Sequence, residues 1–127
     1  MTCFEMRNPF RDINKRGIKK MAYLIVFTKW PSESTPEVLK KAIEITAKFP
    51  PDDSFGESVV PKAVSAGFKG NKTIGITLVK EGQMEGLQRR TMETMAMYAP
   101  VPGFEYKIET WATVEEAYAA IGQTPPD

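Results

Sequence analysis

The nine residues from Ala22 to Trp30, AYLIVFTKW, constrain the fold more than any other part of the chain. Between Tyr23 and Phe27 every side chain is aromatic, branched or aliphatic. A strand with one solvated face alternates apolar and polar residues, and this stretch does not. We therefore expect a strand buried on both faces, in the middle of a sheet, with protein packed on each side.

Two amphipathic helices and three further strands follow that stretch. Ser34 and Glu37 have the spacing of a capping box, and Pro36 suits a first helical turn, so a helix should begin at Ser34. Apolar spacing and the positions of Pro and Gly predict the remaining boundaries. In chain order we expect a helix over 34–48, strands over 58–68 and 73–79, a helix over 83–98, a strand over 104–111 and a short terminal helix over 113–121.

The character of these strands predicts their order in the sheet. Pro61 cannot donate to a hydrogen-bond ladder, which places its strand at an edge or at a bulge. The last strand alternates apolar residues with Glu105, Lys107 and Glu109, as an edge strand does. The first and third strands, which carry the most apolar residues, should then be central.

This βαββαβ order resembles the ferredoxin-like α+β fold, a four-stranded antiparallel sheet in the order 4-1-3-2 with both helices on one face. Within that fold, residues 22–121 resemble the dimeric α/β-barrel superfamily in topology and strand character. The superfamily includes cofactor-independent monooxygenases of antibiotic biosynthesis, polyketide cyclases, stress-responsive barrel proteins and domains without a known activity. The resemblance implies a homodimer in which two sheets pack back to back.

A physical argument also favours a homodimer. Two helices can cover only one face of a four-stranded sheet, and a large apolar patch left on a monomer usually marks an interface. Suppose that Tyr23, Ile25 and Phe27 of the first strand face the helices. The second copy should then contact the residues left on the other face, Leu24, Val26, Trp30, Val79 and Trp111. The alternative is that the N-terminal leader or the terminal helix folds over this face.

The resemblance also implies a ligand site inside each protomer, between the sheet and the helices. Carried onto this sequence, its tentative lining is Tyr23, Ile25, Phe27, Phe49, Ile76, Met95, Tyr98, Tyr106 and Ile108. Such a lining suits a flat, mostly apolar molecule held by tyrosine hydroxyls. The alternative is that the same side chains fill a solid core.

Composition narrows the possible chemistry. The chain has one cysteine and no histidine, which removes internal disulfides, thiolate metal clusters and the commonest general base. We predict no metal site and no cofactor, and no residue is identified as catalytic. No apolar run reaches the roughly 20 residues of a membrane helix, so a cytoplasmic protein is expected.

The charge is unevenly distributed along the chain. Residues 1–20 hold six Lys and Arg against Glu5 and Asp12, which leaves +4 there and −3 on the remainder of a chain whose net charge is +1. We interpret residues 1–20 as a basic leader that is flexible or packs on a partner, with translation starting at Met1 or at Met21. Residues 21–127 then form a single domain. Six cations without interleaved aromatic residues make nucleic acid an improbable partner.

These observations predict a small-molecule-binding homodimer without an established catalytic activity. One alternative is a cofactor-independent, monooxygenase-like or cyclase-like enzyme that acts on an aromatic or polyketide-like compound. The other is a structural dimer module with a filled core.

Overall fold

The computed structural model describes residues 22–126. The predicted leader over residues 1–20 and the alternative start at Met21 lie outside the described residues. The elements, in chain order, are β1 (Ala22–Trp30), the 3-10 turn η1 (Ser32–Ser34), α3 (Thr35–Lys48), the 3-10 turn η2 (Asp53–Phe55), β2 (Gly56–Gly67), β3 (Gly70–Val79), α4 (Met84–Ala96), β4 (Glu105–Ala112) and α5 (Val114–Ala120).

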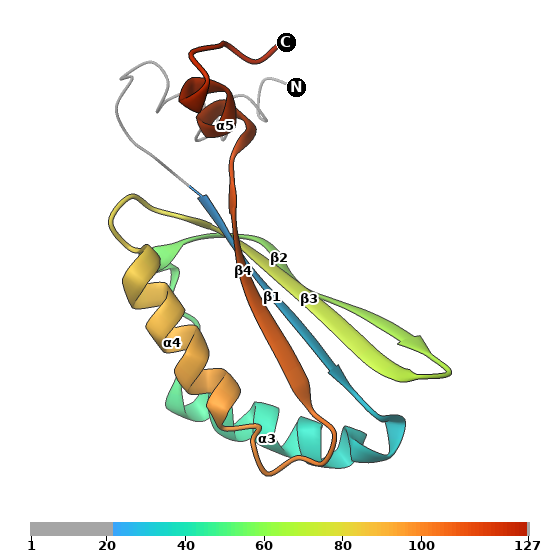
Figure 1. Cartoon of the computed structure of the whole chain (residues 1–127). Coiled ribbons are helices and arrows are strands. Elements are labelled where there is room, and N and C mark those ends of the chain that lie inside the picture. The colour runs from blue at the N-terminus through green and yellow to red at the C-terminus, as the bar shows by residue number, and fades with distance from the viewer. Residues whose placement is uncertain (1–21, 127) are drawn as a thin grey trace, which may run out of the picture.

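The four strands form one antiparallel sheet in the order β2-β3-β1-β4. This is the predicted ferredoxin-like α+β arrangement, with β1 and β3 in the centre and β2 and β4 at the edges. Figure 1 shows α3 and α4 on one side of the sheet and α5 beyond the end of β4. The long apolar run of β1 therefore has the central place that its composition predicted.

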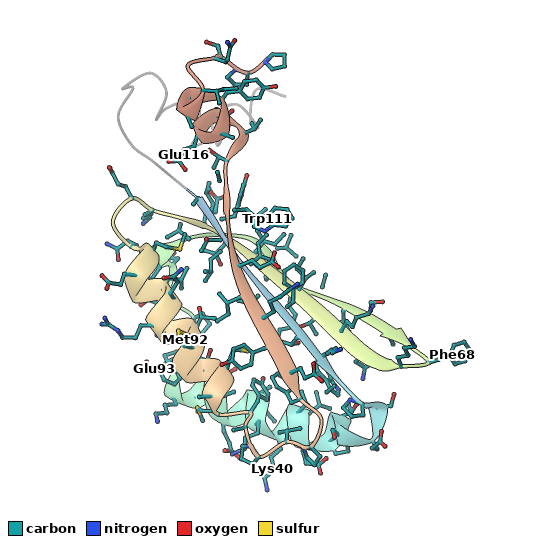
Figure 2. The ribbon with its side chains drawn as sticks, viewed as in Figure 1. Lys40, Phe68, Met92, Glu93, Trp111 and Glu116 are labelled. Atoms are coloured by element: carbon teal, nitrogen blue, oxygen red, sulfur yellow. The ribbon has the colours of Figure 1, made fainter. Side chains whose placement is uncertain are left out.

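Edge strand β2 is irregular where its sequence predicted a break. The pairing of β2 with β3 shifts register between Ser58 and Val60 and again between Val60 and Ala63, and Pro61 lies within the second interval. Because proline lacks an N–H group, a regular ladder cannot pass through it. The β2–β3 hairpin extends away from the helices, and Phe68 at its tip is fully exposed (Figure 2).

The two faces of β1 are the reverse of what the sequence analysis assumed. One set of β1 residues faces α3 and α4: Leu24, Val26, Thr28 and Trp30. These side chains line the same hollow as Val38 of α3 and Met95 of α4. Tyr23, Ile25 and Phe27 alternate with them and therefore face away from the helices. Since both sets are apolar, the local sequence of β1 does not decide which set the helices cover. The predicted assignment was wrong for this reason. We call the two sides the helix-side face and the free face.

Three stacked aromatic rings form the core at one end of the helix-side face. The Tyr98 and Phe104 rings stack at 4.2 Å between centroids, and the Phe104 and Trp30 rings at 6.0 Å. Val38 of α3 and Val101 pack with the buried rings of Trp30 and Tyr98. This cluster fixes the loop after α4 against the end of β1 and the start of α3.

Ser34 joins the same two regions, but not as a helix cap. The predicted capping box does not form, because the Ser34 side chain makes no cap hydrogen bond to α3. Instead its buried hydroxyl donates to the carbonyl oxygen of Pro102 at 2.6 Å. The preceding turn η1 places Ser34 against the 100–103 loop, and this tertiary hydrogen bond replaces the local one.

Candidate functional site

A hollow of about 440 Å³ lies between the helix-side face and the two helices. Its floor comes from β1, β2 and β3, and its walls from α3, α4 and the aromatic cluster. The lining is mostly apolar and includes Leu24, Val26, Val38, Leu39, Ala42, Val60, Val64, Leu87, Met95, Tyr98 and Phe104. Its volume falls within the range of about 300–1,000 Å³ that is typical of small-molecule sites.

The size of the hollow follows from how little of the space between the layers is filled. The buried core cluster occupies only the end near Trp30. Opposite Val26 on β3 stands Gly75, which has no side chain, and its strand neighbours on the same face are Thr73 and Thr77. Because these floor residues are small, the sheet and the helices enclose space between them.

The aromatic end of the hollow carries one polar group without a hydrogen bond. The Tyr98 ring is buried, and among the described residues its hydroxyl makes no hydrogen bond. Burial raises the pKa of Tyr98 above its ordinary value, so this hydroxyl stays protonated across the neutral range. A neutral hydroxyl at the wall of an apolar hollow can donate to or accept from a ligand.

A second group of polar side chains lines the hollow where β1 meets α3. The Thr35 hydroxyl accepts hydrogen bonds from the Trp30 indole N–H and from the Asn71 side-chain amide, each at 3.1 Å. The Thr28 and Thr73 hydroxyls bond to each other across β1 and β3. These groups satisfy one another, so they supply a preformed polar edge.

The far end of the hollow continues into a shallower depression of about 450 Å³ beside η2. The two share Thr77 and Leu87, so they are contiguous. Arg90 of α4 lies over the rings of Phe49 and Phe55 here and donates to the Pro50 carbonyl oxygen.

Asp52 stands at the rim of this depression and accepts a hydrogen bond from the backbone N–H of Ser54 at 2.9 Å. Hydrogen bonding from Ser54 lowers the pKa of Asp52. The rim therefore keeps a negative charge at neutral pH.

The hollow itself offers little acid–base chemistry. Among the described residues that line it, the ionisable ones are Lys62, on an exposed stretch of β2, and Tyr98. Within residues 22–126 there is also no group of three His, Cys, Asp or Glu side chains arranged to hold a metal ion. None of the helices that the structure describes is long and apolar enough to cross a membrane.

The predicted lining residues separate into several places. Met95 and Tyr98 line the hollow, and Ile76 is part of its floor, but Ile76 lies opposite Ile25 and so has its side chain on the free face. Tyr106 and Ile108 lie opposite Thr28 and Val26 and so share the helix-side face, but they belong to the edge strand and do not line the hollow. Phe49 contacts Arg90 and Lys48 at the end of α3. Tyr23, Ile25 and Phe27 were assigned wrongly, because they lie on the free face.

Because the two faces of β1 are exchanged, most of the predicted dimer residues lie on the helix-side face. Leu24, Val26 and Trp30 line the hollow, and buried Val79 lies opposite Ala22 on the helix-side face. Trp111 does lie on the free face, opposite Tyr23, with 55% of its surface exposed (Figure 2).

The free face is apolar in its centre. It carries Tyr23, Ile25 and Phe27 of β1 together with their opposite partners Leu78, Ile76 and Ile74 of β3. Ile25 and Leu78 are buried, whereas Phe27, Ile74 and Trp111 are partly exposed. Burial, and after it the negative charge of Glu115, raises the pKa of Tyr23 on this face.

The sequence did not predict the polar part of the hollow, formed by Thr28, Thr35, Thr73 and Asn71. A signal for it was present in β3, where Thr73, Gly75 and Thr77 alternate with isoleucine and leucine. Small and hydroxyl-bearing residues on one face of a central strand indicate either solvent or a cavity. On β3 this face lines the hollow.

Comparisons with known proteins show similarity at the level of overall architecture. No family model matches the sequence, and no curated protein matches it significantly. One similar solved structure is that of a Caulobacter crescentus CB15 protein named as a candidate antibiotic biosynthesis monooxygenase. The two chains are 17% identical, with a TM-score of 0.48 over 83% of this chain and 99% of the other. Similarity at this level carries no conclusion about the activity of this chain.

Proposed function

We propose that this protein binds a small, mostly apolar molecule in the hollow between the sheet and its two helices. The observation that carries the proposal is the incomplete filling of the space between the layers. The buried core occupies one end, and about 440 Å³ with a largely apolar lining remains beside it. Burying apolar ligand surface there contributes about 25 cal/mol per Å².

The polar groups of the lining specify how such a ligand is oriented. The Tyr98 hydroxyl is available at the aromatic end, and the threonine and asparagine groups mark the edge near β1. A ligand with a flat apolar body and one hydroxyl or carbonyl group matches this arrangement. Its body lies over Val26 and Gly75, and its polar group reaches Tyr98.

The chemistry of the lining favours binding over catalysis. General acid–base catalysis needs a titratable group within hydrogen-bond reach of the reacting atom. The described lining offers Tyr98, whose pKa burial raises, and exposed Lys62. A cofactor-independent enzyme acting on a phenol would have to use Tyr98, so Tyr98→Phe should abolish turnover of any candidate substrate.

We also propose that two copies associate through the free face. Its partly exposed apolar side chains, Phe27, Ile74 and Trp111, have no described element packed over them comparable to α3 and α4 on the other side (Figure 1). Burial of such a face by a second copy is the usual outcome for a four-stranded sheet with helices on one side.

Tryptophan fluorescence tests the binding site, because the two tryptophans of the chain lie on opposite faces. Trp30 lines the hollow, and Trp111 lies on the free face. In Trp111→Phe, a neutral naphthylamine probe should quench the remaining fluorescence of Trp30 in a saturable way. In Trp30→Phe, the same probe should quench Trp111 weakly and without saturation. Quenching confined to Trp111 would contradict the proposed site.

A pair of alanines on α3 provides a matched control. Ala42 lines the hollow, whereas Ala47 is exposed on the same helix. Ala42→Phe should fill part of the hollow and weaken probe binding at least tenfold, while Ala47→Phe should leave it unchanged. Equal affinities in the two variants would show that the probe binds elsewhere.

Light scattering tests the association separately. Trp111→Glu should shift a dimer toward monomer, whereas Ile43→Glu, a change at a side chain 73% exposed on α3, should not. A wild-type protein that is monomeric at micromolar concentration would refute the association and leave the binding site intact.

A further inference from the structure

A second hollow, of about 350 Å³, lies at the end of the sheet near Lys72 and Lys29, and it is basic. Its lining includes Lys72 of β3, Lys29 of β1 and Lys107 of β4, three strands that lie side by side (Figure 1). Lys29 pairs with Lys72, and Lys107 pairs with Phe27. Because residues directly opposite each other share a face, all three lysines stand on the free face.

The Lys29–Lys72 pair is electrostatically unfavourable. The two lysines are directly opposite each other in the antiparallel β1–β3 ladder. Like charges in that position destabilise a sheet, because their side chains leave neighbouring Cβ atoms in the same direction. A repulsive pair in the two central strands is a cost that an anion would relieve.

The nearby carboxylates neutralise this positive charge only in part. Lys29 lies 3.6 Å from Glu105, and Lys107 lies 3.0 Å from Glu109. Lys72 has no ion-pair partner within residues 22–126. The lining holds three lysines and Glu105, and Glu109 stands beside Lys107, so the local excess is one positive charge, on Lys72.

Phe27 limits where an anion can sit. The ammonium group of Lys107 lies over the Phe27 ring at 5.0 Å from its centroid. This cation–π contact and the ion pair with Glu109 place the Lys107 ammonium beside the Phe27 ring, with 65% of the side chain exposed. Lys107 and Lys29 therefore flank the ring, and Lys72 stands across from Lys29.

We propose that this basic hollow binds a small oxyanion that carries two or more negative charges. Lysine ammonium groups act as compact point charges toward phosphate and carboxylate oxygens. Three of them on adjacent strands suit a multivalent anion of the size of pyrophosphate or citrate. A single copy of the chain provides all three lysines, which stand on the free face beside Phe27 of the proposed contact between copies. The basic hollow meets the apolar hollow at Thr28 and Thr73.

Isothermal titration with pyrophosphate at low ionic strength tests this proposal. The wild-type protein should bind it, and the affinity should fall as sodium chloride is added, because salt screens exposed charges. Lys72→Met should weaken binding about tenfold or more, the loss expected for one charged contact. The matched control is Lys69→Met, which removes a lysine from the turn of the same hairpin that lines neither hollow. Its affinity should stay within about twofold of the wild type.

Thermal unfolding without the anion gives a second readout. If Lys72 serves binding at the expense of the fold, Lys72→Met should unfold at the same temperature as the wild type or higher, since the repulsion with Lys29 is removed. Lys29→Met should show the same loss of binding. Absence of pyrophosphate and citrate binding in the wild type, or equal losses in Lys72→Met and Lys69→Met, would overturn the proposal.

Discussion

Replacing Phe104 by alanine should destabilise the protein strongly, because its ring is the middle member of the aromatic stack. Phe104 contacts Tyr98 at 4.2 Å and Trp30 at 6.0 Å between centroids, with interplanar angles of 11° and 13°. Removing a fully buried phenylalanine costs about 3–5 kcal/mol. Since Phe104 is only partly buried, we expect a loss of about 2–3 kcal/mol, of which each ring pair contributes about 0.5–1.5 kcal/mol.

Urea unfolding measures this loss, and Phe68→Ala is the control. With a typical denaturant dependence of about 1–3 kcal/mol per M, the Phe104→Ala midpoint should fall by about 1–2 M. Phe68 is fully exposed at the tip of the β2–β3 hairpin, so Phe68→Ala should change the free energy of unfolding by less than about 0.5 kcal/mol. If Phe104→Ala were as mild as Phe68→Ala, the stacked rings would not be the core, and the described closed end of the apolar hollow would be wrong.

Three further predictions concern side chains around the same framework. Ser34→Ala should cost about 1–2 kcal/mol in urea unfolding, because the hydrogen bond to Pro102 is lost, while Ser32→Ala, at an exposed position of the same turn, should be neutral. Burial raises the pKa of Tyr98, so the protonated tyrosine stabilises the folded state below the ordinary tyrosine pKa, and this stabilisation is lost as pH rises through the pKa of Tyr98 in the folded protein. Tyr98→Phe should therefore reduce the loss of stability at alkaline pH. Hydrogen bonds from Lys107 and Trp111 lower the pKa of Glu109, so the ionised carboxylate stabilises the folded state above the ordinary glutamate pKa, and this stabilisation is lost as pH falls through the pKa of Glu109 in the folded protein. Glu109→Gln should therefore make the free energy of unfolding less dependent on pH in the acid range.

Much of the fold could be predicted from the sequence, because the informative residues act locally. Pro61 interrupts the hydrogen-bond ladder of any strand that contains it. An apolar run such as Tyr23 to Phe27 is stable only in a strand that has other strands on both sides. These constraints predicted the central and edge strands and the order β2-β3-β1-β4.

The facing of β1 could not be predicted in the same way. Each of its faces carries three or more large apolar residues, so helices could pack on either. A difference of one residue in the register with β4 exchanges the two sets. The actual register pairs Val26 with Ile108 and Phe27 with Lys107. The charged residues of β4 thus share the free face with Tyr23, Ile25 and Phe27. The pairing of β1 with β4, and not the sequence of β1 alone, determines which face of β1 the helices cover.

The candidate sites depend on the same long-range information. Met95 and Tyr98 could be placed between the layers from helical spacing alone. The polar edge with Thr35 and Asn71 joins residues 36 positions apart, and it appears only once the end of β1 meets α3. The repulsive lysine pair likewise requires the β1–β3 register, since neither Lys29 nor Lys72 is unusual in its own strand.

Methyl NMR of the leucine and valine side chains, with the neutral naphthylamine probe added, tests the central proposal most directly. Methyl groups that line the apolar hollow, such as those of Val26, Leu39 and Leu87, should show saturable shifts. The methyl groups of Val59 and Val114, which lie outside it, should not shift. Shifts absent from the first group, or confined to the second, would contradict a binding site between the sheet and its helices.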